Sequence, residues 1–228
     1  MSTFLSIDGT AVPEPVMRLA ELMSSYPRPW SLCGGWAIDA WLGRTSRDHG
    51  DVDLSVFDSD HQQLADHLAG WQLIAHNSAV NDGSTGLWDG RPLPVPSHIH
   101  ARSPADAGPL PDDGVCEPAM GWWLDIQIDE GHGDECVLKR DPRVALAISD
   151  AIRMSPWRVP AASPEVLLFF KAALPRRRDW RDFVAMLPRL DAKQIVWLRD
   201  AIAVAYPEHP WIDALSWADS LPRSGLKA

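Results

Sequence analysis

Cysteine is scarce in this chain of 228 residues, which contains only Cys33, Cys116 and Cys136. Three is an odd number, and the spacings show neither a Cys-x-x-Cys pair nor a mixed Cys/His ligand pattern. The sequence therefore predicts neither a disulfide framework nor a cysteine-based zinc site. We expect reduced thiols and a cytoplasmic location.

Long apolar runs are also missing. No stretch of about 18 apolar residues occurs, which is the length that a membrane-spanning helix needs. Residues 1–16 lack the positively charged start and apolar block of an export signal. The sequence therefore predicts no membrane association.

Basic residues are fewer than acidic ones, with 21 Lys and Arg against 31 Asp and Glu, which gives a formal net charge of -10. Affinity for nucleic acid comes mainly from Lys and Arg placed against phosphates, so no nucleic-acid partner is expected. Between residues 103 and 138 there is no Lys or Arg. Such a segment either attracts a polycation or keeps a loop-rich surface soluble. Its acids are Asp106, Asp112, Asp113, Glu117, Asp125, Asp129, Glu130, Asp134 and Glu135.

The rest of the composition is that of an ordinary globular protein, with 46% hydrophobic and 23% charged residues. The chain length suits one catalytic domain with a helical appendage. The twelve tryptophans are unusual. They serve either in packing or, in part, as a stacking surface for a base or sugar.

The first third of the chain has a legible order of elements. Helical spacing of apolar residues predicts a helix over 15–25, followed by a strand at 30–32 and a second helix over 36–42. Period-two alternation predicts a strand over 51–57. A helix over 58–68, capped by Asp58 or Ser59, is expected next.

The remainder divides into a loop-rich part and a helical part. Residues 77–118 are rich in Gly, Pro, Ser and Asp, with a possible strand at 97–101, and strands are predicted at 122–129 and 136–139. Helices are predicted over 164–173, 179–187 and 192–205. We expect an α+β fold with a catalytic domain at 1–158, built on a small mixed sheet flanked by helices, and a helical C-terminal domain at 159–228.

Two acids in the strand over 51–57 are candidates for metal binding. Asp51 and Asp53 point to the same side of a strand, with alpha carbons about 7 Å apart. Two carboxylates on one face suit magnesium, which keeps its other positions for water and phosphate oxygens. An Asp-x-Asp pair is also common at a solvated strand edge, so the pair alone does not establish a metal site.

Gly34 and Gly35 lie between the strand at 30–32 and the following helix. Without side chains, their backbone can approach a ligand closely, and the N–H groups at the helix start can face an anion. Such a turn would bind a triphosphate. An ordinary tight turn is the alternative.

The combined pattern resembles a known superfamily. GGWAIDAWLG (34–43), followed by RDHGDVDL (47–54), is similar to the nucleotidyltransferases related to DNA polymerase beta. Within these it looks like the antibiotic-modifying branch, which includes aminoglycoside adenylyltransferases and lincosamide nucleotidyltransferases. The resemblance is carried by residues 31–57. It implies the nucleotidyltransferase fold and a Mg²⁺ cofactor held by Asp51 and Asp53.

The resemblance also implies a third acid on a later strand. Asp125, in WWLDIQ, matches best, and Asp129 on the same strand face is the reserve. The third acid would complete the metal site or accept the acceptor's proton as general base. The catalytic and metal-binding set is thus Asp51, Asp53 and Asp125.

Further matches concern the nucleotide. In PEVLLFFKAALPRRRDWRDF (164–183), the motif implies that Lys171 reaches the phosphates, the alternative being a solvated helix residue. Arg176 to Arg178 form either a phosphate-facing rim or a solvated charge run. Arg47 and His49 would contact phosphate or brace the turn, and Ser31 is a further candidate for phosphate contact.

The implied reaction is transfer of a nucleoside monophosphate, AMP in the first place, from a nucleoside triphosphate to a hydroxyl of a small acceptor. An aminoglycoside or lincosamide is the acceptor that the resemblance suggests. The alternatives are a protein-modifying adenylyltransferase of toxin–antitoxin type and a catalytically silent nucleotide-binding module. A monomer and a homodimer are both compatible with the sequence.

Overall fold

The computed structural model describes residues 11–77, 85–106 and 123–220, and within them the strands form one mixed sheet. The strand order is β4-β3-β5-β6-β2-β1-β10-β9, with β7 joined to β6 and β8 to β7. The pairs β2/β6 and β1/β10 are parallel and the others are antiparallel. The strands are β1 (Trp30–Leu32), β2 (Val52–Phe57), β3 (Gln72–Asn77), β4 (Thr85–Leu87), β5 (Ser97–Arg102), β6 (Leu124–His132), β7 (Glu135–Val137), β8 (Ala145–Ala147), β9 (Ile152–Met154) and β10 (Pro160–Ala162).

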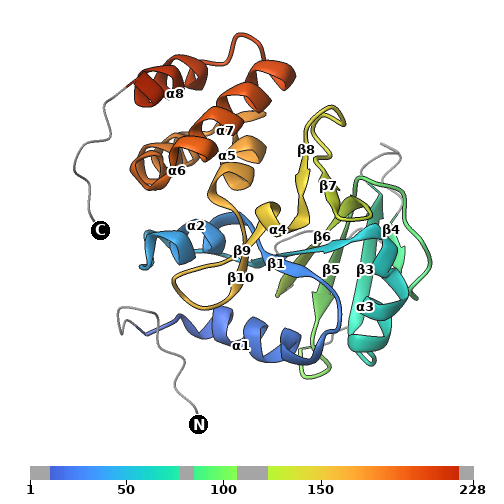
Figure 1. Cartoon of the computed structure of the whole chain (residues 1–228). Coiled ribbons are helices and arrows are strands. Elements are labelled where there is room, and N and C mark those ends of the chain that lie inside the picture. Colours follow the sequence, from blue (N-terminus) through green and yellow to red (C-terminus); the bar gives the residue numbers. More distant parts are fainter. Residues whose placement is uncertain (1–10, 78–84, 107–122, 221–228) are drawn as a thin grey trace.

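The helices lie around this sheet, and four of them, α5 to α8, follow one another in the C-terminal part of the sequence. In Figure 1, α5 to α8 (orange to red) form a group beside α2, while α3 lies near β3 and β4 at the other end of the sheet. The helices are α1 (Glu14–Leu22), α2 (Gly34–Leu42), α3 (His61–His67), α4 (Ile148–Ala151), α5 (Pro164–Ala172), α6 (Arg177–Met186), α7 (Ala192–Ala205) and α8 (Trp211–Ser220), with 3-10 turns at Met23–Ser25, Asp58–Asp60 and Leu187–Arg189. The expected α+β class is confirmed.

One face of the central strands is apolar and the other is polar. Leu54 and Val56 of β2 and Ile126 and Ile128 of β6 are almost fully buried. Leu19 of α1 belongs to the same hydrophobic core. Alternation along each strand sends the intervening residues to the opposite face. The active-site acids predicted from the sequence therefore lie on the face away from this core.

Most elements predicted from the sequence are present, and the differences have local causes. The predicted strand at 97–101 is β5, and that at 122–129 corresponds to β6, which begins at Leu124 after a non-strand Trp123; residue 122 lies outside the described residues. The expected cap at Asp58 or Ser59 is wrong, because the N-cap of α3 is Asp60. The Asp58 carboxylate instead accepts a hydrogen bond from the Gly131 N–H.

Several elements were not predicted, namely β3, β4, the short strands after β7, α4 and α8. The strand β10 follows residue 158 and pairs with β1, so the sheet continues past the boundary placed between 158 and 159. Helices occupy the chain from Pro164 onward. Among the described residues, no helix has both the length and the apolar character required to cross a bilayer.

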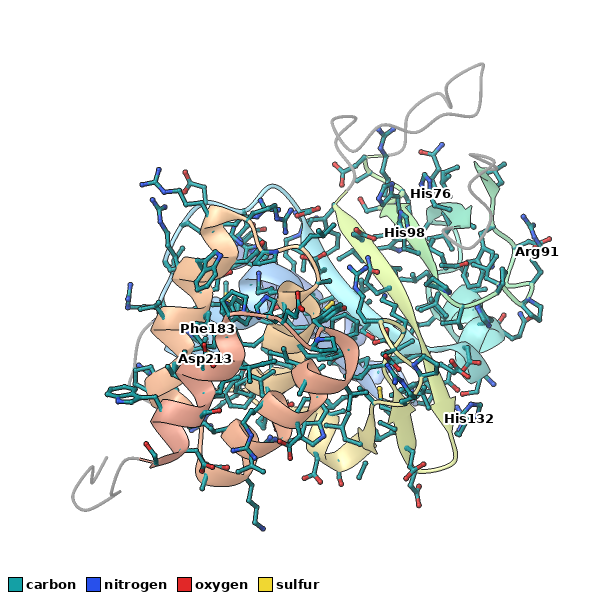
Figure 2. All side chains as sticks on the ribbon, turned by 90° about the horizontal axis from the view of Figure 1, so that it is seen from above. His76, Arg91, His98, His132, Phe183 and Asp213 are labelled. Atoms are coloured by element: carbon teal, nitrogen blue, oxygen red, sulfur yellow. The ribbon has the colours of Figure 1, made fainter. Side chains whose placement is uncertain are left out.

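The helical layer has an aromatic core of its own around Trp211, which is fully buried. Its ring stacks on Phe183, with centroids 4.2 Å apart, and meets Trp180 edge-on at 5.7 Å. Figure 2 shows Phe183 among these helices. Stacked and edge-on aromatic pairs stabilise a core beyond the area that they bury.

Trp211→Ala is therefore expected to lower the free energy of unfolding by about 3–5 kcal/mol, because it leaves a large cavity among α6, α7 and α8. Trp217→Ala on the same helix is the matched control, since Trp217 is 64% exposed. It should change stability by less than about 0.5 kcal/mol. Urea denaturation followed by circular dichroism measures both, and equal losses would contradict the packing described.

Candidate active site

The Gly-Gly turn connects β1 to α2 and holds Asp53 in place. Gly34 has a φ of +63°, in the left-handed region that favours glycine. A Cβ on Gly34 would overlap the Asp53 carboxylate. The Gly35 N–H donates a hydrogen bond to the same carboxylate. The missing side chain at Gly34 thus leaves room for an aspartate, which is a role that the sequence pattern did not reveal.

Gly35 makes room for two other predicted residues, Arg47 and His49. A Cβ on Gly35 would overlap the Arg47 guanidinium and the His49 ring. The His49 side chain is only 3% exposed, and its Nε2 lies 2.7 Å from Oδ2 of Asp39, which is fully buried in α2. Its ring packs on Trp36 with centroids 4.3 Å apart. These contacts brace the turn against the loop that precedes β2.

Asp39 anchors this brace electrostatically. Burial alone would raise the pKa of the Asp39 carboxyl. Hydrogen bonds from His49 and Ser46 outweigh burial and hold the pKa below its ordinary value. The carboxylate is therefore the stable form, and it fixes the loop between α2 and β2.

Three carboxylates meet where β2 lies beside β6. The parallel register pairs Asp53 with Asp125, and Asp51 stands just before β2. One carboxylate oxygen from each lies within 4.8 Å of the others, with Asp51 exposed and the other two partly buried. The structure therefore brings together the three acids predicted from the sequence.

Convergence raises the pKa of two of these acids. The pKa of Asp53 rises to about 6, mainly through burial and then through the charge of Asp51. The pKa of Asp125 rises to about 7, again through burial first and then through Asp53 and Asp51. Such raised values are expected where like charges converge out of water. A divalent cation would relieve the repulsion, so these residues fit magnesium.

Asp129, the reserve candidate, lies four residues further along β6 on the same face and has different partners. Its carboxylate accepts a hydrogen bond from the Ser55 hydroxyl and lies 3.4 Å from the Lys139 Nζ. Lys139 also donates to Gln127, whose amide in turn donates to Asp125 at 2.9 Å. Asp129 is thus held in an ion pair, away from the cluster of three acids.

A pocket of about 620 Å³ opens between the polar face of the sheet and helices α5 and α6. Gly34 and Asp53 line it on the sheet side. Lys139 and Arg140 lie at its wall beyond β7, and Phe170, Lys171 and Arg176 line it on the helical side. The pocket thus combines basic side chains with an apolar and aromatic surface.

Lys171 is held firmly in this wall. Its side chain is 11% exposed, and its Nζ lies 3.1 Å from Asp179 and 2.8 Å from Asp182. Arg176 also lines the pocket and pairs with Asp179 at 2.9 Å. Arg177 and Arg178 are exposed.

Ser31 lies on the pocket side of the sheet but does not reach the pocket itself. It is 3% exposed and pairs with Ser55 across the β1/β2 ladder, so both side chains point to the pocket side of the sheet. Ser55 lines the pocket, whereas Ser31 does not. No tryptophan of the described residues lines this pocket, so none of those tryptophans forms its stacking surface.

Sequence reasoning missed several residues around the site: Lys139, Arg140, Asp179, Asp182 and His100. The Lys139-Arg140 pair at the end of the strand predicted over 136–139 was an available signal. The pairing of Lys171 with Asp179 and Asp182 requires the turn between α5 and α6, which spacing alone does not specify. Asp106, Asp125, Asp129, Glu130, Asp134 and Glu135 of the acidic segment are described, whereas Asp112, Asp113 and Glu117 lie outside the described residues.

The sheet, the glycine turn and the three convergent acids agree with the nucleotidyltransferase resemblance of the sequence. Residues 15–78 match the family described as aminoglycoside-2''-adenylyltransferase. This segment contains Gly34, Gly35, Asp51 and Asp53, and it ends before Asp125. A search of curated protein sequences gave no significant match.

Several solved structures are similar to this chain in fold. The crystal structure of ANT(2'')-Ia in complex with adenylyl-2''-tobramycin is 16% identical, covers 84% of this chain and 96% of that chain, and gives a TM-score of 0.50. The solution structure of ANT(2'')-Ia is 16% identical, covers 85% and 91%, and gives 0.51. Lincomycin-bound LnuA, a lincosamide adenylyltransferase, is 17% identical, covers 77% and 96%, and gives 0.49. The family match over residues 15–78 and the shared fold support the resemblance to antibiotic-modifying nucleotidyltransferases.

Gly34→Ala is expected to weaken magnesium affinity about 10–100-fold, the range typical when a residue that supports a metal ligand is changed. The new methyl group would displace the Asp53 carboxylate and strain a backbone with positive φ. Gly50→Ala is the matched control, because a Cβ there meets no atom within 4 Å. Isothermal titration calorimetry with MgCl₂ measures both variants, and equal affinities would contradict the role given to Gly34.

The raised pKa of Asp125 predicts a pH dependence of stability in metal-free protein. A carboxyl whose pKa is about 7 when folded and about 3.9 when unfolded binds its proton more tightly in the folded state. The free energy of unfolding therefore falls as the pH rises from about 4 to about 7. Asp125→Asn should flatten this fall by a few kcal/mol, at about 1.4 kcal/mol per pKa unit.

Urea denaturation in EDTA at pH 5 and pH 8 measures this effect. Asp213→Asn, on the exposed side of α8, is the control and should follow the wild type. A wild type whose stability rises between pH 5 and pH 8, with Asp125→Asn parallel to it, would contradict the raised pKa.

Proposed function

We propose that this chain is a magnesium-dependent adenylyltransferase that moves AMP from ATP to a hydroxyl of a small cationic acceptor, in the first place an aminoglycoside. One observation carries the proposal. Asp51, Asp53 and Asp125 converge beside a 620 Å³ pocket whose opposite wall carries Lys171 and Arg176. A negative cluster for metal next to a basic pocket suits a triphosphate bound with its cation.

Asp51, Asp53 and Asp125 would hold the magnesium. Their oxygen donors are of the kind that Mg²⁺ prefers, and their mutual repulsion without a cation supports the assignment. When bound, the metal would neutralise phosphate charge and order the phosphates for an in-line displacement. Gly34 and the N–H of Gly35 would keep the Asp53 carboxylate in the position that this requires.

The nucleotide would occupy the pocket between the sheet and the proposed domain at 159–228. Lys171, fixed by Asp179 and Asp182, would contribute a positive charge toward the phosphates, with Lys139, Arg140 and Arg176 around them. Phe170 would offer an aromatic surface to the base. Arg47 and His49 would act by bracing the turn, and Ser31 would support the strand beneath it.

Asp125 would take the proton of the acceptor hydroxyl. The pKa of about 7 is that of the metal-free site, and a bound cation would lower it, so Asp125 would be an ionised carboxylate able to accept the proton. As the proton leaves, the acceptor oxygen forms a bond to the alpha-phosphorus of ATP, and the bond from that phosphorus to the pyrophosphate oxygen breaks. Asp129, paired with Lys139, would shape the pocket without a role in proton transfer.

The family name and the tobramycin adduct reported for ANT(2'')-Ia support an aminoglycoside acceptor. The net charge of -10 and the acidic segment over 103–138 add to this, because negative potential attracts polycations. A lincosamide, a protein acceptor and a silent nucleotide-binding module are the competing possibilities. A cytoplasmic location, where ATP is abundant, belongs to the same proposal.

The experiment is pyrophosphate release with each of four nucleoside triphosphates, with and without Mg²⁺, against aminoglycoside and lincosamide panels. We expect turnover with ATP and an aminoglycoside that needs Mg²⁺ and falls at least about 10³-fold in Asp53→Asn, because one of the few metal ligands is lost. Asp213→Asn, an exposed acid on α8, should keep wild-type turnover.

Two results would overturn the proposal. Tight ATP binding without turnover on either panel would favour a protein acceptor or a silent module. Turnover that persists in Asp53→Asn would show that the three acids do not form the reaction centre.

A further inference from the structure

The polar face of the sheet does not end at Asp125 but continues across β5 to β3. Cross-strand register aligns Asp53, Asp125 and His100 in one row. The next row places Gln127 opposite His98, and His98 opposite His76. Three histidines therefore share one face of the sheet, beside the carboxylate cluster and one strand beyond it.

The three imidazoles are close to one another. Ring centroids lie 4.7 Å apart for His76 and His98, 4.4 Å for His76 and His100, and 5.1 Å for His98 and His100. One ring nitrogen from each lies within 4.8 Å of the others. Figure 2 shows His76 and His98 side by side on neighbouring strands, well apart from His132.

Burial makes this cluster unlike a chance grouping on the surface. His100 is 7% exposed, and His76 and His98 are partly buried. The Nε2 of His76 is buried and has no hydrogen-bond partner among the described residues. A buried ring nitrogen without a partner costs free energy unless a ligand or water satisfies it.

We propose that His76, His98 and His100 form a binding site for zinc(II) or a chemically similar first-row divalent ion. Three histidines with a fourth position left for water are a common zinc-binding arrangement. A tetrahedral ion at about 2.0–2.1 Å from each nitrogen holds the nitrogens roughly 3.4 Å apart, so binding would draw the rings inward by at most about 1 Å.

The chemistry of the donors separates this site from the carboxylate cluster. Imidazole nitrogen suits zinc, copper and nickel, whereas carboxylate oxygen suits magnesium. Burial first, and then the neighbouring imidazoles, lower the pKa of His98 to about 4, so binding at neutral pH displaces no proton from this ring. The two sites are nevertheless adjacent, because the Nε2 of His100 lies 4.0 Å from Oδ1 of Asp125.

The test uses the full chain without a histidine tag, freed of metal by dialysis against a chelator. Zinc binding is measured by competition with a chromophoric chelator, and cobalt(II) is added as a spectroscopic probe. We expect one zinc ion per chain and an intense visible band from cobalt(II) in low-symmetry nitrogen coordination. The double variant His76→Gln, His98→Gln should bind zinc at least about 100-fold more weakly.

Two controls locate the site. His132→Gln removes an exposed histidine at the end of β6, and Asp53→Asn removes a carboxylate of the neighbouring cluster. Both should bind zinc like the wild type. Circular dichroism of each variant in EDTA checks the fold, and the cobalt spectrum of the wild type tests the site without any substitution.

The proposal is overturned by three outcomes. One is a wild type without an intense cobalt band and with zinc affinity equal to that of the double variant. Another is unchanged zinc affinity in a folded double variant. The third is zinc affinity lost in Asp53→Asn and kept in the double variant, which would place zinc at the carboxylates. Because the readout is metal binding, these results are independent of whether adenylyl transfer is observed.

Discussion

Repulsion among Asp51, Asp53 and Asp125 is the constraint on which the rest of the site depends. Folding brings three carboxylates to within 4.8 Å of one another, and burial, followed by their mutual repulsion, raises the pKa values of Asp53 and Asp125. Such an arrangement is unfavourable without a cation. The three carboxylates stay close together because the Gly34 turn and the parallel pairing of β2 with β6 hold them in place.

The hydrophobic core supplies the free energy that keeps these acids together. The apolar residues that alternate with the polar ones along β2 and β6, Leu54, Val56, Ile126 and Ile128, are 0–1% exposed on the opposite face of the sheet. A slip of one residue between β2 and β6 would turn this apolar set toward the pocket and the aspartates toward the core. The register that pairs Asp53 with Asp125 is therefore fixed by packing that has no part in the chemistry.

Local patterns in the sequence were enough to predict the parts of the site that are close in the chain. Alternation over 51–57 predicted the strand and the shared face of Asp51 and Asp53, and the Gly34-Gly35 pair predicted the turn. The choice between Asp125 and Asp129 depends on a neighbouring strand, and only the β2/β6 register shows that Asp125 joins the cluster while Asp129 pairs with Lys139. Strand β3 was not predicted, so the proximity of His76 to His98 could not be.

The same register explains why one sheet face can present two kinds of metal donor without mixing them. Oxygen donors come from β2 and β6, and nitrogen donors come from β5 and β3, so strand order separates them in space. Asp125 stands at the boundary, with Asp53 on one side and His100 at 4.0 Å on the other. Both Asp53 and His100 influence the ionisation of Asp125, because a charge on either side changes the free energy of the ionised carboxylate. The histidines next to Asp125 thus contribute to its electrostatic environment. They are not part of the sequence motif around Asp51 and Asp53.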